Sequence, residues 1–233
     1  MSFDPFAAEY DAHLTRGISL SGEDKEFFAR GRLVAAALYL QAVGVRPRRI
    51  VEFGCGIGTN LGTIAAMWPE SSIVGIDRSE SSLEVARARG VDARIGLMTP
   101  ADYVAHSTER ADWVFCNGVF HHIPPAEQPG ALEQIRSTLR PGGAFTLFDN
   151  NPFNPGARWV MKRIPFDHDA IMINPYTLAR RLREAGFDEV RCRFLFVFPR
   201  FVSMLRPLEP HLERLPLGAQ YGVCGILPRD ATA

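Results

Sequence analysis

The chain has 233 residues, a length that suits one α/β domain with an added cap better than two full domains. Hydrophobic residues make up 46% of it and charged residues 22%, which allows a sizeable core in an ordinary soluble protein. The 26 basic and 26 acidic residues cancel. This neutral balance lacks the positive charge of a duplex nucleic-acid binder and favours a small-molecule substrate.

The four cysteines are scattered along the chain, at Cys55, Cys116, Cys192 and Cys224. They form no C-x-x-C pair and have no histidine at metal-ligand spacing, so we expect reduced thiols and no metal site. The first ten residues carry Asp4 and Glu9 and lack an apolar signal core. No stretch reaches the roughly 18 apolar residues that a membrane span needs. These features predict a soluble, cytoplasmic protein without a transmembrane segment.

The first predicted element is a helix over residues 21–44. Ser21, with Asp24 three residues later, fits a capping box, and Gly44 fits the C-terminal stop. Apolar residues recur between them at roughly helical spacing. Pro47 then breaks the chain before the first strand.

Strand and helix patterns alternate from there on. Short apolar runs predict strands at residues 49–53, 72–76, 92–97, 113–116 and 144–148. Helices are predicted between them at residues 59–67, at 79–89 and around Leu132, Ile135 and Leu139. Such alternation is typical of a parallel sheet with helices on both faces.

The last third of the chain changes character. Asn174 can cap a helix that has Pro175 at its first position and Gly186 after its end. A proline-rich segment then joins two predicted strands, residues 191–202 and 219–227. We expect one domain, made of an N-terminal helical cap (1–45), a nucleotide-binding core (46–150) and a substrate-side part (151–233) that completes the same domain.

A glycine-rich turn, reading EFGCGIG over residues 52–58, links the first strand to the next helix. Glycines let the backbone adopt positive φ and approach a ligand without interference from a Cβ atom. The nicotinamide fingerprint G-x-G-x-x-G fails here, because its third glycine would stand at Thr59 and not at Gly58. A tight structural turn without a ligand remains the other interpretation.

An acidic residue, Asp77, ends the second strand, 25 residues after Glu52. A carboxylate in this place can accept hydrogen bonds from both hydroxyls of an adenosine ribose. Both nucleotide classes use such an acid, so Asp77 alone does not separate them. A solvated turn is the alternative.

Four motifs together resemble those of class I S-adenosylmethionine-dependent methyltransferases. They are the glycine motif within residues 50–62, the acidic strand end at 73–79, the stretch ADWVFCNGVFHHIP at 111–124 and the turn LRPGG at 139–143. They occur in the family's order over about two-fifths of the chain. The resemblance implies a Rossmann-like α/β fold, with a seven-stranded, mostly parallel sheet, helices on both faces and an antiparallel C-terminal strand.

The same resemblance implies a cofactor, S-adenosyl-L-methionine, and residues that would hold it. The loop of Gly54, Cys55, Gly56 and Gly58 would pass under its methionine and ribose portions. Glu52 would hold the loop or the cofactor's amino group. Asp77 would bind the ribose hydroxyls, and Arg78 would flank the adenine.

Further cofactor contacts are implied beyond the loop. Asn117 and Gly118, after the fourth strand, would touch the methionine end. Met98 stands where relatives often place an aspartate for the adenine amino group, so it would offer backbone and apolar contact instead. Tyr10 and Arg32 lie in an N-terminal segment of the kind that closes over the cofactor in a branch of the family.

Three residues are candidates for the reacting end. His121 and His122 follow the fourth strand, and His122 is preferred as a base by its position in the family motif. Asn151, after the fifth strand, is a candidate for orienting substrate. His168, between two aspartates, is a further candidate base because flanking carboxylates raise an imidazole pKa. Structural hydrogen bonding or simple solvent exposure is the alternative for each.

The expected reaction is direct displacement of the methyl group onto an oxygen, nitrogen or carbon of a small-molecule acceptor. The tail over residues 194–217 is rich in Phe, Leu and Pro, which suggests an apolar or lipid-linked acceptor, although it could simply cover a sheet edge. Two other functions remain open: a non-catalytic subunit that binds the cofactor, and an aminopropyl-transferring enzyme, against which the His-His-Ile-Pro stretch speaks.

Overall fold

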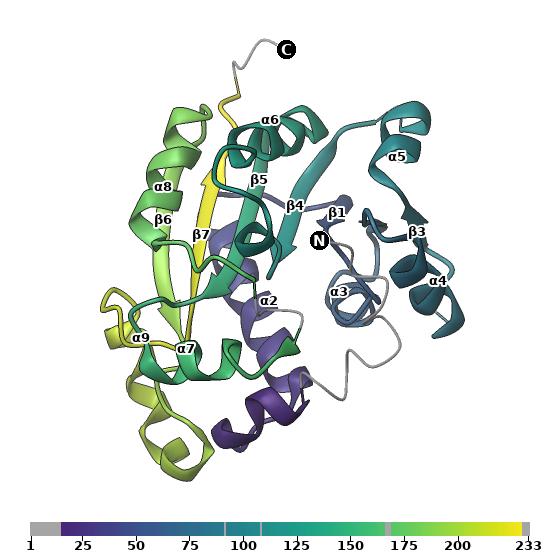
Figure 1. Cartoon of the computed structure of the whole chain (residues 1–233). Helices are drawn as coiled ribbons and strands as arrows, with labels where there is room; N and C mark the ends of the chain where they lie inside the picture. Colours follow the sequence, from purple (N-terminus) through teal and green to yellow (C-terminus); the bar gives the residue numbers. More distant parts are fainter. Residues whose placement is uncertain (1–14, 91, 108, 166–168, 230–233) are drawn as a thin grey trace.

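The computed structural model describes residues 15–90, 92–107, 109–165 and 169–229, which fold around one sheet (Figure 1). Its seven strands lie in the order β3-β2-β1-β4-β5-β7-β6. Their bounds are β1 Arg49–Phe53, β2 Ser72–Ile76, β3 Ile95–Met98, β4 Ala111–Asn117, β5 Leu139–Asn150, β6 Asp188–Leu195 and β7 Gln220–Ile226. The pairs from β3 to β5 are parallel, and β7 runs antiparallel to both β5 and β6. The mostly parallel sheet and its antiparallel strand are confirmed.

Helices cover both faces of the sheet, as predicted. One face packs on α5 (Pro100–His106), α6 (Gln128–Thr138) and α8 (Pro175–Glu184), and the other packs on α2 (Lys25–Ala42), α3 (Leu61–Met67) and α4 (Glu80–Ala88). Among the described residues, no helix is long and apolar enough to cross a bilayer. The buried strands between the two layers are hydrophobic on both sides, as parallel strands require.

The start of α2 differs from the prediction. Asp24 caps the helix, because its carboxylate accepts from the backbone N–H of Phe27 at 2.7 Å. Ser21 instead closes a short 3₁₀ turn, η2 (Ser19–Ser21), and its hydroxyl donates to Ile18 O at 2.6 Å. The predicted stop is confirmed, since Gly44 has a φ of +73°.

The predicted strand over residues 191–202 is too long. β6 ends at Leu195, because Phe196 adopts a φ of +62° and turns the chain out of the sheet. A 3₁₀ segment, η5 (Arg200–Leu208), and the short α9 (Glu209–Leu212) follow. The stretch after β5 also holds a helix, α7 (Pro155–Met161), which Asn154 caps by accepting from Ala157 N at 2.9 Å.

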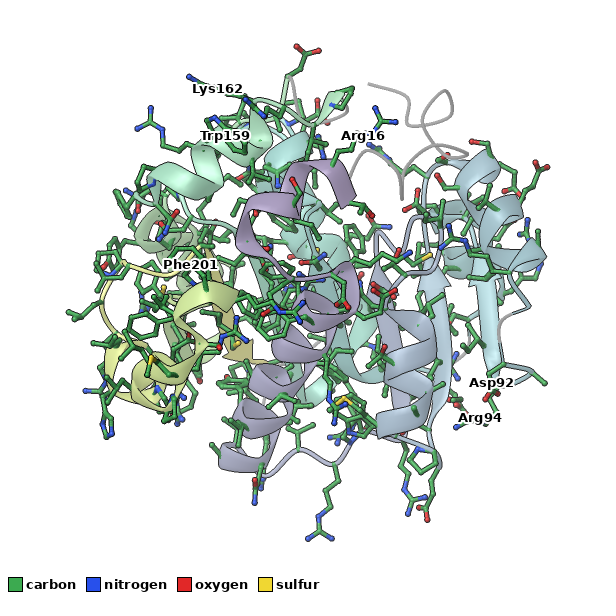
Figure 2. All side chains as sticks on the ribbon, turned by 90° about the horizontal axis from the view of Figure 1, so that it is seen from below. Arg16, Asp92, Arg94, Trp159, Lys162 and Phe201 are labelled. Atoms are coloured by element: carbon green, nitrogen blue, oxygen red, sulfur yellow. The ribbon has the colours of Figure 1, made fainter. Side chains whose placement is uncertain are left out.

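The carboxyl ends of β1, β4 and β5 point to the same end of the sheet, where α7 and the segment with η5 lie beyond them (Figure 1). Figure 2 looks onto that end. The strand order reverses between β1 and β4, where the chain moves from one side of β1 to the other. Crevices at such a point are the usual ligand sites of open parallel sheets.

Candidate active site

A cavity of about 1190 Å³ opens at this end of the sheet. It is large for a single small ligand, since ligand pockets usually hold about 300–1,000 Å³. Predicted site residues that line it are Gly54, Cys55, Gly56, Asp77, Arg78, Asn117, Gly118 and His122. The glycine loop and the histidines therefore share one space.

The loop over residues 54–58 has backbone angles and close contacts that require glycine, and we call it the glycine cradle. Gly54 has a φ of +74°, and a Cβ atom there would lie 2.3 Å from Cγ2 of Val119. Gly56 has a φ of +52° and faces open space, with no atom of the described residues within 4 Å of the position of a Cβ. Gly58 does not line the cavity; it lets the loop pack on Ala86 of α4, 3.3 Å from where its Cβ would be.

Asp77 holds this loop from the end of β2. Its Oδ2 accepts from Gly56 N at 2.7 Å and its Oδ1 accepts from Ser79 N at 2.9 Å. Each oxygen of a carboxylate can accept more than one hydrogen bond, so these contacts are compatible with hydroxyl donors from a ligand. Arg78, beside it, is exposed at the cavity margin.

Glu52 lies behind the cavity lining and is only 1% exposed. Its Oε1 accepts from Asn60 Nδ2 at 2.7 Å, and its Oε2 is buried with no hydrogen-bond partner in the described part of the chain. Desolvation raises the pKa of Glu52 to about 8, against the smaller lowering effects of Asn60 and Arg32. An unsatisfied buried carboxyl group of this kind favours a cationic ligand nearby.

These features fit S-adenosylmethionine, which carries a ribose diol and two cationic centres. The cradle at Gly56 leaves room for backbone contact, Asp77 offers carboxylate oxygens at the strand end, and Glu52 holds an unsatisfied buried oxygen. Among the described residues, no group of three or more His, Cys, Asp or Glu side chains could hold a metal ion.

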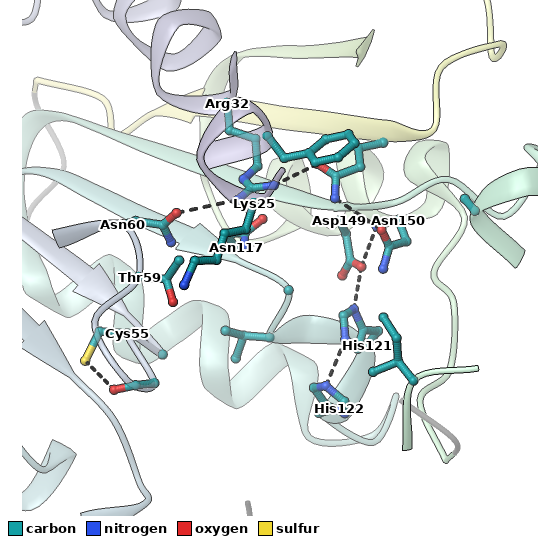
Figure 3. A pocket seen from close by; sticks show the side chains of 18 of the residues that line it. Lys25, Arg32, Cys55, Thr59, Asn60, Asn117, His121, His122, Asp149 and Asn150 are labelled. Carbon is teal, nitrogen blue, oxygen red and sulfur yellow. Dashed lines mark hydrogen bonds and ion pairs between the residues drawn. The ribbon is translucent and has the colours of Figure 1, made fainter. Parts of the chain in front are cut away.

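A chain of hydrogen bonds begins at Glu52 and crosses the cavity, and Figure 3 shows its part from Asn60 and Arg32 onward. Asn60, which binds Glu52, also accepts from Arg32 Nη2 at 3.5 Å, and Arg32 Nη1 donates to Gln220 Oε1 at 3.1 Å. Gln220 Nε2 donates to Asn150 Oδ1 at 3.2 Å, which follows from the register that places these two residues opposite each other on β7 and β5. Arg32 is 6% exposed and links the cap helix to both sides of the site.

This chain of hydrogen bonds ends at two histidines and an aspartate (Figure 3). His121 Nδ1 lies 2.5 Å from Asp149 Oδ1, and His121 Nε2 lies 2.9 Å from His122 Nε2. Asp149 Oδ1 also accepts from Asn150 N at 2.7 Å. His121 and Asp149 are 3% and 1% exposed, and His122 is half-buried and lines the cavity. The sequence favours His122 and does not single out Asp149, although a polar residue at the end of a buried strand is a signal that points to it.

The structure does not bring every candidate to the cavity. Asn151, predicted to orient substrate, is fully buried and donates through Nδ2 to the carbonyls of Pro216 and Gly218, at 3.1 and 2.7 Å. Its amide therefore holds the loop between α9 and β7, and this explains why it lies outside the lining. Met98 also lies outside the lining, with its carbonyl accepting from Asp77 N at 3.2 Å. Tyr10 and His168 lie outside the described residues.

Comparisons with known proteins agree with this geometry. Residues 51–145 match the family model described as a methyltransferase domain. A trans-aconitate 2-methyltransferase of Mycolicibacterium gilvum is 31% identical over 153 residues, 60% of this chain and 58% of that protein. A ubiquinone biosynthesis O-methyltransferase of Bordetella avium is 27% identical over 165 residues, which is 63% of this chain and 65% of that protein.

The first relatives are thus matched over less than two thirds of their length. Among solved structures, an S-adenosylmethionine-dependent methyltransferase of Archaeoglobus fulgidus superposes with a TM-score of 0.60 at 16% identity, over 84% of this chain and 94% of that one. Residues 51–145 are therefore a methyltransferase domain, and the chain has the fold of the class I S-adenosylmethionine-dependent methyltransferases.

Proposed function

We propose that this protein transfers a methyl group from S-adenosylmethionine to a small-molecule acceptor, at an oxygen or nitrogen that carries a proton. The observation that supports this most is the Asp149–His121–His122 chain, which meets the same cavity as the glycine cradle. A proton-accepting side chain is needed mainly when the acceptor atom must lose a proton as it is methylated.

The loop from Gly54 to Gly56 and the carboxylate of Asp77 would hold the cofactor, with Glu52 behind them facing its cationic part. When bound, S-adenosylmethionine supplies an electrophilic methyl group, whose carbon–sulfur bond breaks with the electron pair remaining on sulfur. Because the leaving group is already good, the residues around it contribute chiefly by alignment and by excluding water.

With the Asp149 carboxylate ionised, the hydrogen bonds support one arrangement of the protons on the two histidines. Asp149 Oδ1 accepts from Asn150 N, and as an ionised carboxylate oxygen it would also accept from His121, with the proton of that ring on Nδ1. His121 Nε2 then accepts from His122 Nε2–H, which makes Nδ1 of His122 the nitrogen that can take a proton. The buried charge of Asp149 stabilises the imidazolium that results.

Two measurements test the proposal. Calorimetric titration should show binding of S-adenosylhomocysteine and no binding of NAD, and tight binding of NAD alone would contradict it. Transfer of labelled methyl from S-adenosylmethionine to a panel of hydroxyl- and amine-bearing metabolites should then give a product with wild-type protein and far less with His122→Ala. Binding of S-adenosylhomocysteine without transfer to any panel member would favour a non-catalytic subunit.

A further inference from the structure

A cluster of phenylalanines forms one wall of the cavity. Phe28 and Phe196 pack edge to face, with their ring centroids 4.9 Å apart, and Phe27 lies 5.4 Å from Phe28 and 5.7 Å from Phe196. All three rings line the cavity. Two come from the first turn of α2 and the third from the chain just after β6, so the cluster joins segments about 170 residues apart.

Phe196 is held in a strained conformation. Its φ of +62° lies in the left-handed region, which is rare for a bulky residue and strains the backbone. Two contacts fix it there: its carbonyl accepts from Ala219 N at 3.1 Å, and its ring covers Gly31, where a Cβ would lie 2.5 Å from Cε1. Strain of this kind is concentrated at ligand sites, and here it turns an aromatic ring toward the cavity.

Apolar side chains from two further elements extend this wall. Val160 of α7 and Ile164 just beyond it line the cavity, as do Val197 and Phe198. We call Phe27, Phe28, Phe196, Phe198, Val160 and Ile164 the aromatic chamber.

The charges that line the cavity balance. Four are basic and four are acidic: Lys25, Arg32, Arg78 and Arg206 against Glu23, Asp77, Glu127 and Asp149. Arg206 and Glu23, which border the aromatic chamber, neutralise each other's charge, because Arg206 Nη2 lies 2.7 Å from Glu23 Oε1. The Arg206 guanidinium also lies over the ring of Phe27, 4.5 Å from its centroid. A polycarboxylate acceptor would bring several negative charges into a space with no excess of positive charge to receive them.

We infer that the acceptor is an uncharged aromatic compound with a hydroxyl group, bound with its ring in the aromatic chamber and its hydroxyl toward His122. This rests on the proposed function and specifies its substrate class. Offset and edge-to-face contacts with Phe28 and Phe196 would orient the ring. The hydroxyl carries the proton that the histidine pair is arranged to accept.

The test is a calorimetric binding panel, run with and without saturating S-adenosylhomocysteine. The uncharged phenols are catechol and 2-naphthol, and the carboxylates are trans-aconitate and citrate. We expect the phenols to bind and the carboxylates not to bind. Phe28→Leu, which keeps an apolar side chain at a helical position, and Phe196→Gly, which suits the positive φ but lacks the ring, should each weaken phenol binding by about tenfold.

Phe201→Ala is the matched control. Phe201 lies on η5, is 81% exposed at the end of the molecule seen in Figure 2 and does not line the cavity. Its loss should leave phenol binding unchanged. Equal or tighter binding of the carboxylates, no binding of either class, or no effect of both chamber variants overturns the inference. Failure of the proposed function is seen separately, as no affinity for S-adenosylhomocysteine in the titration without phenols.

Discussion

The two sides of the cavity are built in different ways. The proposed cofactor side comes from one short stretch, residues 52–77, and presents mainly backbone groups and glycines to the cavity. The acceptor side comes from α2, α7 and the chain after β6, and presents side chains. A common cofactor can be recognised by backbone geometry encoded locally, whereas an acceptor pocket depends on side chains that only the tertiary fold brings together.

The two sides also differ in charge. Two acids, Glu52 and Asp77, lie at the cofactor side, where a cationic ligand is expected. At the acceptor side Arg206 and Glu23 neutralise each other. His122 lines the same cavity, and in the proposed function it faces the acceptor. Variants on the cofactor side should therefore change the affinity for S-adenosylhomocysteine, and variants on the acceptor side should change kcat or the affinity for the acceptor.

The largest effect is expected for His122→Ala. Losing the side chain that accepts the proton should lower kcat by about 10²–10⁴-fold. The affinity for S-adenosylhomocysteine should stay close to wild type, because His122 belongs to the acceptor side. Steady-state kinetics and calorimetry measure the two quantities, and an equal loss in both would contradict the division between the sides.

Glu52 predicts a pH dependence of stability. Burial raises its pKa in the folded protein to about 8, above its ordinary value near 4.5. Between these values the folded state binds more protons than the unfolded state, so the free energy of unfolding falls as pH rises through this window. A single group contributes at most about 1.4 kcal/mol per pH unit.

Glu52→Gln removes this titration and should flatten the profile. Urea unfolding of both proteins at pH 5, 6, 7 and 8 measures the difference. Parallel profiles for the variant and the wild type would mean that Glu52 is ionised in the folded protein throughout.

Gly54→Ala tests the cradle itself. The positive φ costs about 1–2 kcal/mol for alanine, and overpacking against Val119 adds about 1–3 kcal/mol. We expect the free energy of unfolding to fall by about 2–5 kcal/mol in denaturant titrations, with cofactor binding weakened as well. Gly62→Ala, on α3 with no described atom within 4 Å of its Cβ position, is the control and should gain up to about 1 kcal/mol.

The smallest of these effects is expected for Asp77→Ala. A lost charge-assisted hydrogen bond costs about 1.5–3 kcal/mol, or roughly 10- to 150-fold in the dissociation constant of S-adenosylhomocysteine. Calorimetry measures this change. Binding of catechol, on the acceptor side, should not change, and a parallel loss of both affinities would show that the two sides are not independent.

Much of the core could be predicted from sequence because its signals are local. The strands from β1 to β4 and the centre of β5 contain short apolar runs, and the turn at Gly54 lies between adjacent elements. The start of α2 was predicted wrongly because Ser21 and Asp24 are both good caps. Only the local backbone decides between them, and it places Asp24 at the cap.

Contacts between distant residues could not be predicted in this way. Asp149 lies 28 positions from His121, and Arg32 lies 188 positions from Gln220. No periodicity in the sequence links such pairs. The pairing of β5 with β4 brings Asp149 to His121, and the packing of α2 on β5 and β7 brings Arg32 to Gln220. Asn151 looked like a site residue because it follows a strand, yet its side chain is used to hold the backbone at Pro216 and Gly218.

The glycine turn, the acid at Asp77 and the alternation of strands and helices could be predicted from the sequence, because each depends on residues close together in the chain. The strand order, the proposed proton-accepting residues and the aromatic chamber became visible only in the folded structure. The last two require side chains from separate elements to meet, and the chamber also requires Phe196 to take a positive φ that its own propensity disfavours.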